Sequence, residues 1–590
     1  MAAINHSQPV TATDRIRSIL ADYVPVAAGW LSEEGGSFRD PYETEYSENY
    51  APANAAVLFA AVYRTTEDAS VLRLFHTAVR RSVELLGDKA GVAPFCRVFL
   101  IHYSLMAMLL LEDEEREEAV RRYGPFLAGY EDDCAIVNTN CAALQWGTEL
   151  FLDTLGIREA SLPHLSRRLA FIEQAQLESG FINDEVNERE VLDGMPIPYH
   201  AFTLFLLAGP FALLPDWKSR HERERVAAEL LMSRGLDWLE QAISADGTFA
   251  MVERSSHQTF TWGAFVALYA GSGLEDEGLL DRAVAAWLPY RHADGTYGCT
   301  PNVLPHSLRT GYESYTHLNM YNLLGLTGLA VAARLLERGL RFRTAHELPA
   351  ANRYVDAASG YAFYRRGDAF FACTLRMHNR RYTPALQGFQ FRLGGRALPL
   401  AEPRLPGGAA DSARRLDEGV WEGYLLRRAD GGAAYPDTTR NAAVSATEDE
   451  DGFTLVLEDA HVRCTKAIRL LADGFAWDYR LELLQPIVSC EHVLPLVVHD
   501  GRHALHVRED SPQRLTLAWA GDRYALECDA AVRMGMRLER SLLSPSGVAA
   551  QLRIELTVPS EAAGAVCDGS SGGNEPLAVI AWRTTLRRLP

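Results

Sequence analysis

Two asparagines, Asn138 and Asn140, stand directly before an apolar stretch that contains Trp146. In the simpler interpretation one of them caps the N-terminus of a helix, because an asparagine side chain accepts a hydrogen bond from the first helical turn. An asparagine amide can also donate to a carboxylate and stabilise the charge that develops there in a transition state. We therefore predict Asn138 and Asn140 as candidate catalytic residues and Trp146 as a candidate for substrate binding.

A second pair of polar residues, Tyr199 and His200, follows Pro196 and Pro198 and leads into a very apolar helix. A buried tyrosine, or a single histidine on an apolar face, usually belongs to the core. The positive end of a helix nevertheless favours loss of a phenol proton, whose pKa is ordinarily about 10. We predict both side chains as catalytic residues that transfer protons.

Two further polar clusters each follow a turn of sequence Ala-Asp-Gly-Thr, at 245–248 and at 293–296. Each cluster alone is equally well explained as a solvated helix cap. Equivalent turns of a repeated structure gather at one end of it, so the clusters are predicted to share one cleft. A histidine in the second half of the chain is predicted to reach the same cleft. The candidates for substrate binding are Arg254, His257, Tyr312, Glu313, Tyr315, His317 and His378.

Three histidines and one aspartate, within 499–506, offer side chains that could bind a metal. Their spacing matches no established zinc site, and alternate residues of a strand point to opposite faces of a sheet. The nine cysteines contain no Cys-x-x-Cys pair, and no glycine-rich loop precedes a lysine as in a phosphate-binding site. We therefore predict no bound metal and no cofactor.

The elements that position these residues change in character near residue 345. Before this point, apolar residues recur at helical spacing and predict about twelve amphipathic helices. Six helical hairpins that stack and close on themselves form an (α/α)6 toroid, complete or open at one side, and an open solenoid is the alternative. Four similar turns that each end in an aromatic residue support the repeat, at 35–38, 178–181, 246–249 and 294–297.

After residue 345, short segments of alternating apolar and polar residues are separated by turns rich in glycine and proline. This pattern predicts antiparallel strands that form a β-sandwich. The predicted fold class is a multidomain α + β protein. Its toroid, residues 1–345, is the expected catalytic domain, and its antiparallel β-sandwich covers residues 346–590.

The charge of the chain limits its partners. The 590 residues carry 77 acidic and 58 basic side chains, a net charge of −19. An acidic chain without a basic run binds nucleic acid poorly, and no apolar run reaches the roughly 18 residues that span a membrane. The first residues lack the pattern of a secretory signal, so we expect a cytoplasmic protein, and homo-oligomers are compatible with the sequence. An anionic substrate requires a site with its own positive charge.

A helical toroid followed by an antiparallel β-domain resembles the polysaccharide lyases of the heparinase II/III and oligoalginate lyase type. The segments 138–140 and 194–200 are similar to the asparagine motif and the Pro-x-Tyr-His segment of that family. The resemblance implies that Asn138 or Asn140 neutralises a carboxylate and that Tyr199 transfers the proton. It also implies a β-domain histidine, which here corresponds to His378.

The resemblance further implies β-elimination on an acidic oligosaccharide or polysaccharide. The enzyme removes the C5 proton of a uronic acid and expels the sugar linked at O4, and it is expected to act from chain ends. If acid and base stand on opposite faces of the sugar, His200 or His257 becomes the base. One alternative is a glycoside hydrolase of uronides that uses Glu313 and a second carboxylate. Another is a carbohydrate-binding protein without catalysis.

Overall fold

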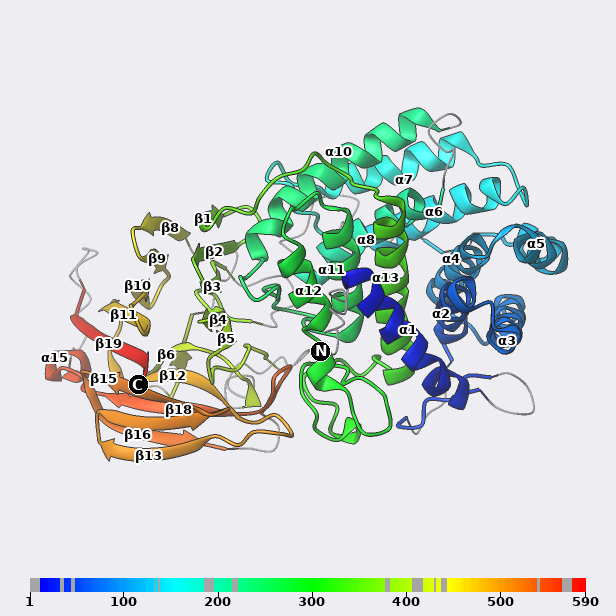
Figure 1. Ribbon diagram of the computed structural model, residues 1–590. Coiled ribbons are helices and arrows are strands. Elements are labelled where there is room, and N and C mark those ends of the chain that lie inside the picture. Colours follow the sequence, from blue (N-terminus) through cyan, green and yellow to red (C-terminus); the bar gives the residue numbers. More distant parts are fainter. Residues whose placement is uncertain are drawn as a thin grey trace, which may run out of the picture.

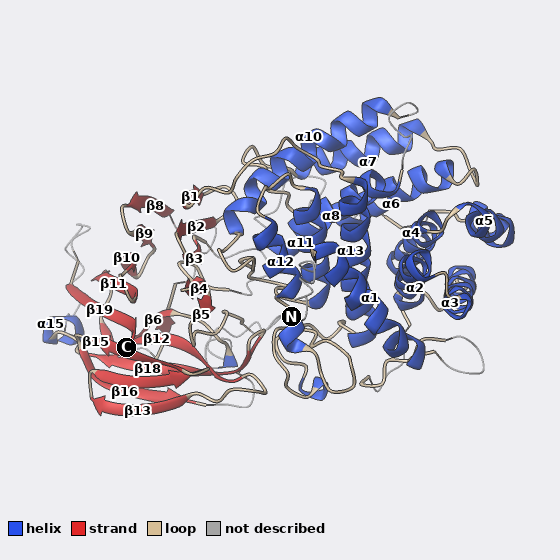
Figure 2. Ribbon diagram, in the orientation of Figure 1, coloured by secondary structure: helices blue, strands red, loops and turns tan. Residues whose placement is uncertain are grey.

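The computed structural model has a helical first part and a β-rich second part (Figures 1 and 2). It describes residues 11–31, 37–43, 48–132, 134–135, 138–184, 196–214, 221–376, 383–405, 418–428, 431–436, 443–538, 542–564 and 576–590. Among these residues, no helix has both the length and the hydropathy of a membrane span.

Six helices form the inner ring of the helical part. They are α2 (Ala51–Thr66), α4 (Pro94–Leu110), α6 (Thr139–Thr154), α8 (Ile197–Leu213), α11 (Thr259–Gly271) and α13 (Leu318–Arg338). Each helix of this ring packs against the next, and α13 packs against α2, so the ring is closed. Most of their side chains are buried on every face, as expected of helices with neighbours on all sides. The predicted toroid is thereby confirmed as a closed one.

An outer layer of amphipathic helices surrounds this ring. It consists of α1 (Ala12–Gly29), α3 (Ala69–Gly87), α5 (Asp113–Ala128), α7 (Leu162–Ala175), α10 (Glu222–Leu239) and α12 (Glu277–Ala285). Each outer helix contacts at least one inner helix. In α3 the buried residues include Val71, Phe75, Ala78 and Val79, a spacing of three and four residues that forms one apolar stripe.

The inner helices α11 and α13 approach each other more closely than side chains normally permit. Gly263 of α11 faces Gly325 and Gly328 of α13, and a Cβ atom built on Gly263 would lie 1.9 Å from the Gly325 carbonyl oxygen. Because backbone touches backbone here, any larger residue at Gly263 would separate the two helices. The close packing of α11 on α13 therefore depends on these glycines, which have no side chain.

The second part of the chain forms three antiparallel sheets. The first consists of β1 (Ala351–Asp356), β2 (Tyr361–Arg366), β3 (Ala369–Thr374), β4 (Gly388–Leu393) and β5 (Arg396–Ala397). The second runs in the order β13 (His506–Ser511), β14 (Arg514–Trp519), β15 (Asp522–Cys528), β19 (Ala578–Arg588), β11 (Gly474–Leu483), β10 (Val462–Leu470), β9 (Gly452–Glu458) and β8 (Ala443–Asp449).

The third sheet completes the β-rich part. It runs in the order β16 (Ala531–Arg537), β18 (Gly547–Leu556), β12 (Ile487–His499), β6 (Gly423–Arg428) and β7 (Ala433–Ala434), with β17 (Leu543–Ser544) also paired to β18. Four short helical segments complete the described elements: η1 (Glu240–Ala242), η2 (Leu288–Tyr290), η3 (His306–Leu308) and α15 (Ser560–Gly564). The sheets agree with the predicted antiparallel β-sandwich.

The first sheet joins the two parts because one of its faces packs on the toroid and the other packs on the rest of the β-rich part. Figure 1 shows its strands between the helices and the other sheets. Phe370 of β3 belongs to the core of the toroid, whereas its neighbour Phe371 belongs to the core of the β-rich part. Successive side chains of a strand alternate between faces, so one strand serves both cores. The Trp238 indole of α10 also donates to Asp356 Oδ2 at 2.9 Å.

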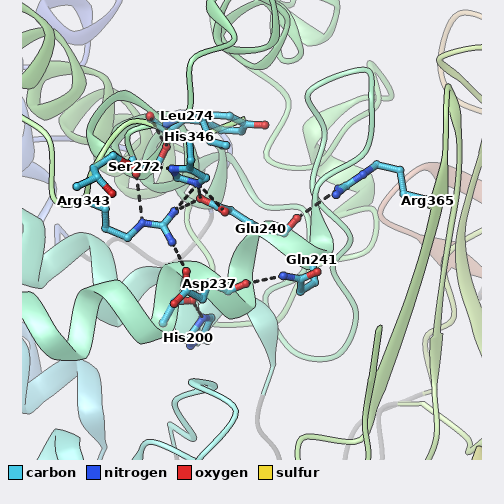
Figure 3. Close-up of polar contacts among 12 residues, drawn as sticks. His200, Asp237, Glu240, Gln241, Ser272, Leu274, Arg343, His346 and Arg365 are labelled. Carbon is cyan, nitrogen blue, oxygen red and sulfur yellow. Dashed lines mark hydrogen bonds and ion pairs between the residues drawn. The ribbon is translucent and has the colours of Figure 1, made fainter. Parts of the chain in front are cut away.

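A cluster of charges around the buried Glu240 holds the connection between α13 and β1 (Figure 3). Arg343 pairs with Glu240 and with Asp237, and His346 Nε2 lies 3.1 Å from Glu240 Oε2. From the first sheet, Arg365 donates to the Ile243 carbonyl at 2.7 Å. The predicted domain boundary at residue 345 falls within this connection, and the division into two domains stays a prediction.

Arg343→Met is expected to destabilise the protein substantially. Burial raises the pKa of Glu240, and Arg343 acts in the opposite direction by stabilising the carboxylate charge. Without Arg343 a buried carboxylate loses its principal cation, which costs about 3 kcal/mol or more in the free energy of unfolding. Urea denaturation measures this loss.

Arg341→Met provides a matched control two residues away. Arg341 lies 3.5 Å from Glu275, and both side chains are about half exposed. An exposed pair of this kind contributes roughly 0 to 1 kcal/mol. Equal losses of stability in the two variants would contradict the assignment of Arg343 as the residue that anchors the connection.

Candidate active site

A cavity of about 270 Å³ opens where the inner helices of the toroid begin. All six inner helices contribute to its wall from the N-cap or the first two turns. The contributing residues include Tyr50, Phe99, Asn140, Tyr199, Phe260 and Tyr321. Six N-terminal helix ends therefore converge on one cavity.

This convergence gives the cavity a positive potential within an acidic protein. Each helix N-terminus carries a partial positive charge of roughly half an elementary charge and free backbone N–H groups. In the described residues, four of the six inner helices begin without a side-chain hydrogen bond to their first turn. The exceptions are α6, which Asn138 caps, and α13, where Asp40 accepts from the Asn319 N–H. The local field thus favours an anion although the chain carries a net charge of −19.

Three hydroxyl groups meet at the edge of this cavity. Tyr199 Oη lies 3.1 Å from Ser255 Oγ and 3.5 Å from Tyr315 Oη, and Ser255 Oγ lies 3.1 Å from Tyr315 Oη. Because hydroxyl groups both donate and accept, the hydroxyls of Ser255 and Tyr315 can both donate to a Tyr199 oxygen that has lost its proton. Tyr199 comes from the first turn of α8, as its position after two prolines predicted.

Arg254 and Asp184 extend this cluster toward the asparagine pair. The Arg254 guanidinium carbon lies 4.5 Å from the centre of the Tyr199 ring, and its Nη2 lies 3.4 Å from Asp184 Oδ2. Asp184 Oδ1 accepts hydrogen bonds from Asn140 Nδ2 and from Thr139 Oγ1, both at 3.3 Å. Asp184 therefore holds Asn140 and Arg254 in place beside Tyr199.

The segment that carries Arg254 and Ser255 is conformationally strained. Glu253, Ser255 and His257 have φ angles of 79°, 62° and 49°, in the left-handed region that non-glycine residues rarely adopt. Backbone strain of this kind concentrates at functional sites, where surrounding structure maintains it. Here the Ser255 N–H donates to Glu313 Oε1 at 3.0 Å.

Glu313 is itself held from two further directions. Gln258 donates to Glu313 Oε2 at 2.6 Å, and Arg404 Nη2 lies 3.2 Å from Glu313 Oε1. Arg404 belongs to the β-rich part, so this part supports the strained segment through Glu313. All three partners of the Glu313 oxygens are donors, an arrangement that suits a carboxylate rather than a carboxylic acid.

The surroundings of Tyr199 favour the neutral phenol. Burial raises its pKa above the ordinary value, whereas Arg254 and the hydrogen bonds with Ser255 and Tyr315 lower it. The same three neighbours would stabilise a phenolate that forms during a reaction, because their dipoles and charge already point at the oxygen.

The structure brings together five of the residues predicted from the sequence. Asn140, Tyr199, Arg254, Glu313 and Tyr315 surround the cavity or support it. Ser255 and Arg404 were not predicted. Nothing in the sequence sets Ser255 apart from its polar neighbours, and Arg404 lies 91 residues from Glu313 along the chain.

Two predicted catalytic residues have other roles in the structure. Asn138 is the N-cap of α6, since its Oδ1 accepts from the Cys141 N–H at 3.0 Å. His200 is a core residue: its Nδ1 accepts from the Ile182 N–H at 2.9 Å, and its Nε2 lies 3.1 Å from the Gly235 carbonyl oxygen. Figure 3 shows His200 beside α10 near Asp237. With both ring nitrogens engaged, His200 cannot act as a base without breaking the core, which corrects its predicted role.

Acid is expected to destabilise the protein through its buried histidines. Burial lowers the pKa of both His102 and His200 from 6.5 to about 3. Between these values the unfolded chain binds protons that the folded chain does not, so stability falls as pH decreases from about 6.5 to about 3, by about 1.4 kcal/mol per pH unit for each histidine. Denaturation with urea at several pH values measures the slope.

His200→Gln is expected to be less stable at neutral pH but to lose less stability on acidification. His164→Gln, which changes an exposed histidine, serves as the control and should retain the slope of the parent protein. An unchanged slope in His200→Gln would show that His200 does not cause the acid sensitivity.

The remaining predicted binding residues do not line the cavity. Trp146 is completely buried in the core, and the Tyr312 hydroxyl donates to the His306 carbonyl at 3.1 Å. His257 lies on the wall of a different cavity, described below. His317 precedes α13 and lies near Asp40 and Glu43. His378 lies outside the described residues.

The groups with metal-ligating side chains have protein partners. Asp40, Glu43 and His317 each place one ligand atom within 4.8 Å of the others. However, Glu43 pairs with Arg309, and Asp40 accepts from the backbone N–H groups of Tyr42 and Asn319. Of the residues at 499–506, Asp500 pairs with His503 at 2.9 Å, and the four do not gather into one cluster among the described residues.

No protein-family model matches the chain, and no curated protein matches it in sequence. Among solved structures, the chondroitin AC lyase of Streptomyces coelicolor A3, in complex with chondroitin sulphate, aligns with a TM-score of 0.50 and 11% identity over 99% of this chain and 80% of that chain. The chain shares its fold with this polysaccharide lyase. At this identity the likeness concerns the fold alone.

Two other solved structures align less closely. A Paenibacillus xanthan lyase has a TM-score of 0.45 and 11% identity over 99% of this chain and 58% of its own. An unsaturated glucuronyl hydrolase from Streptococcus agalactiae has a TM-score of 0.37 and 10% identity over 58% of this chain and 98% of its own.

Proposed function

We propose that the protein is a carbohydrate-active enzyme that cleaves uronic-acid-containing oligosaccharides by β-elimination, acting from chain ends. One observation carries the proposal: Tyr199 Oη faces two hydroxyl groups at a cavity edge while Arg254 stacks on its ring. This arrangement supports a proton transfer that passes through a phenolate. It requires no metal or cofactor to remove a proton from carbon.

In the first step Tyr199 takes the C5 proton of a uronic acid. The phenol must first be ionised by releasing its proton to solvent, and the hydroxyls of Ser255 and Tyr315 then donate hydrogen bonds to the phenolate. The Arg254 guanidinium stabilises the phenolate that forms. As the C4–O4 bond breaks, the proton gained from C5 moves from Tyr199 to the leaving oxygen, and a C4–C5 double bond remains.

The negative charge of the substrate carboxylate has to be neutralised by neighbouring groups before the C5 proton becomes acidic. Asn140 lines the cavity, and among the described residues only Asp184 accepts from its amide nitrogen, which carries two N–H groups. The converging helix N-termini add positive potential from the same side. Asp184 carries a negative charge, but Arg254, Asn140 and Thr139 contact its oxygens and reduce its repulsion of a substrate.

Hydrolysis by Glu313 is the second candidate, and the geometry supports it less. A hydrolase needs a protonated carboxylic acid to assist the leaving group. Ser255, Gln258 and Arg404 all donate to the Glu313 oxygens, which favours the carboxylate form. We therefore assign Glu313 the role of a positioning residue for the strained segment that carries Arg254 and Ser255.

Incubation with a panel of uronate oligosaccharides tests the proposal. A lyase produces ultraviolet absorbance from the new double bond, and one that acts from chain ends shortens the substrate by one unit at a time. We expect absorbance to grow with at least one member of the panel. Cleavage without any absorbance would contradict elimination, and binding without cleavage would favour a carbohydrate-binding protein.

A further inference from the structure

A second cavity, of about 160 Å³, lies between the toroid and the β-rich part. Its wall includes His257, Trp262 of α11 and Trp287 from the helical part, and Gln390 of β4 and Trp477 of β11 from the β-rich part. Thr248, Tyr290 and Arg392 on the wall are partly exposed, so solvent reaches the cavity from the surface. None of these residues has a role in the mechanism above.

Four residues on this wall each contain a buried polar atom that has no hydrogen-bond partner in the part of the chain that the structure describes. These atoms are His257 Nε2, Gln390 Oε1, Arg392 Nε and Trp477 Nε1. His257, Gln390 and Trp477 are more than nine-tenths buried. Buried polar groups are almost always hydrogen-bonded, so several such atoms around one cavity indicate that a bound molecule satisfies them.

The four atoms restrict the chemistry of that molecule. Trp477 Nε1 and Arg392 Nε can only donate, whereas Gln390 Oε1 can only accept. The occupant must therefore offer both acceptors and donors in a small volume, which is the property of adjacent hydroxyl groups. The aromatic walls suit the apolar faces of a sugar ring, as in binding sites that combine apolar walls with a few polar groups.

The charges on the wall favour a neutral sugar over an acidic one. Glu402, Glu422 and Asp500 contribute carboxylates. Glu422 pairs with Lys466 and Asp500 pairs with His503, whereas Glu402 lies 3.9 Å from His257 Nε2. The cation of Arg392 is already paired with Asp246, at 3.3 Å. Because the wall has no unpaired cation among the described residues, a uronate would meet net negative charge here, in contrast to the cavity at Tyr199.

We propose that this second cavity is a binding site for a neutral monosaccharide unit, separate from the cavity at Tyr199. The inference follows from the residues of the second cavity alone and does not depend on the proposed elimination. Its occupant would contact His257, two residues from the Ser255 that holds Tyr199. The strained segment 253–257 therefore connects the two cavities.

Calorimetric titration with glucose, galactose, N-acetylglucosamine and glucuronate tests this site. We expect at least one neutral sugar to bind and glucuronate to bind at least about tenfold more weakly. Gln390→Met, which keeps the shape but removes the acceptor, should weaken binding by about tenfold. Asn140→Leu changes the wall of the cavity at Tyr199 and keeps every wall residue of the second cavity, so it should leave the affinity unchanged.

Two further experiments test the same site: a variant that fills the cavity, and amide hydrogen exchange with and without sugar. Ala286→Trp is expected to abolish binding, and its melting temperature shows whether it folds. Binding should slow amide hydrogen exchange in the segment 253–257. The proposal is overturned if no neutral sugar binds, if Asn140→Leu removes binding while Gln390→Met does not, or if the segment shows no added protection.

Discussion

Tyr199→Phe is expected to lower kcat by about 10³-fold while KM changes little, because proton transfer by a positioned side chain contributes roughly 10² to 10⁴-fold. The ring stays in place under Arg254, so the cavity keeps its shape. Only the oxygen that exchanges the proton is lost, together with its contacts to Ser255 and Tyr315. Initial rates of double-bond formation measure this effect.

Tyr63→Phe is the matched control for this variant. The Tyr63 hydroxyl makes a hydrogen bond to Glu115 at 2.8 Å, so the same chemical group and one contact are removed. Tyr63 lies in the last turn of α2, whereas the cavity lies at the start of that helix. We expect the control to retain full activity. Retained activity in Tyr199→Phe would exclude Tyr199 as the residue that transfers the proton.

Arg254→Leu is expected to lower kcat by about 10²-fold at neutral pH and to shift the pH profile to higher pH. Arg254 lowers the pKa of Tyr199 against the effect of burial. Without the cation the pKa of Tyr199 rises further, and a higher pH is needed to form the phenolate. Part of the lost activity should therefore return in alkaline solution.

Arg254→Lys separates charge from geometry in this prediction. A lysine keeps the cation but cannot stack a planar group on the Tyr199 ring or reach Asp184 in the same way. We expect a smaller alkaline shift than in Arg254→Leu, with kcat between that of the parent and that of the leucine variant. Identical pH profiles in all three proteins would show that Arg254 does not tune Tyr199.

The sequence predicted the architecture because the periodicity of apolar residues is a local property. Helical spacing before residue 345 and alternation after it were sufficient to predict a toroid followed by a β-sandwich. Ring closure depends on α13 packing against α2, and α13 also packs against α11 through Gly263, Gly325 and Gly328. These contacts join residues far apart in the chain, so only the repeated turns gave an indication of them.

The site could be predicted only where a residue's position on its own helix decided its role. Tyr199 and Asn140 stand in the first turns of inner helices, and the sequence places them there. His200 is adjacent to Tyr199 but points into the core, where Gly235 and Ile182 hold it. Which of two neighbouring side chains faces the cavity depends on the packing of α8, which the sequence does not specify.

The net charge illustrates a second limit of sequence-based prediction. A net charge of −19 disfavours an acidic substrate. In the structure, positive potential at the cavity comes from backbone dipoles of the six inner helices, and these dipoles do not appear in a count of charged residues. Arg254 is the cation of the Tyr199 cluster, and it is balanced by Asp184.

The masses of the products test the central claim, elimination at the Tyr199 cavity, most directly. Elimination adds no water, so the masses of the two products sum to the mass of the substrate. Hydrolysis adds one water to that sum. We predict products without added water from the parent protein and Tyr63→Phe, and almost no products from Tyr199→Phe. Products that together contain one additional water would contradict the account and assign the cavity to a hydrolase.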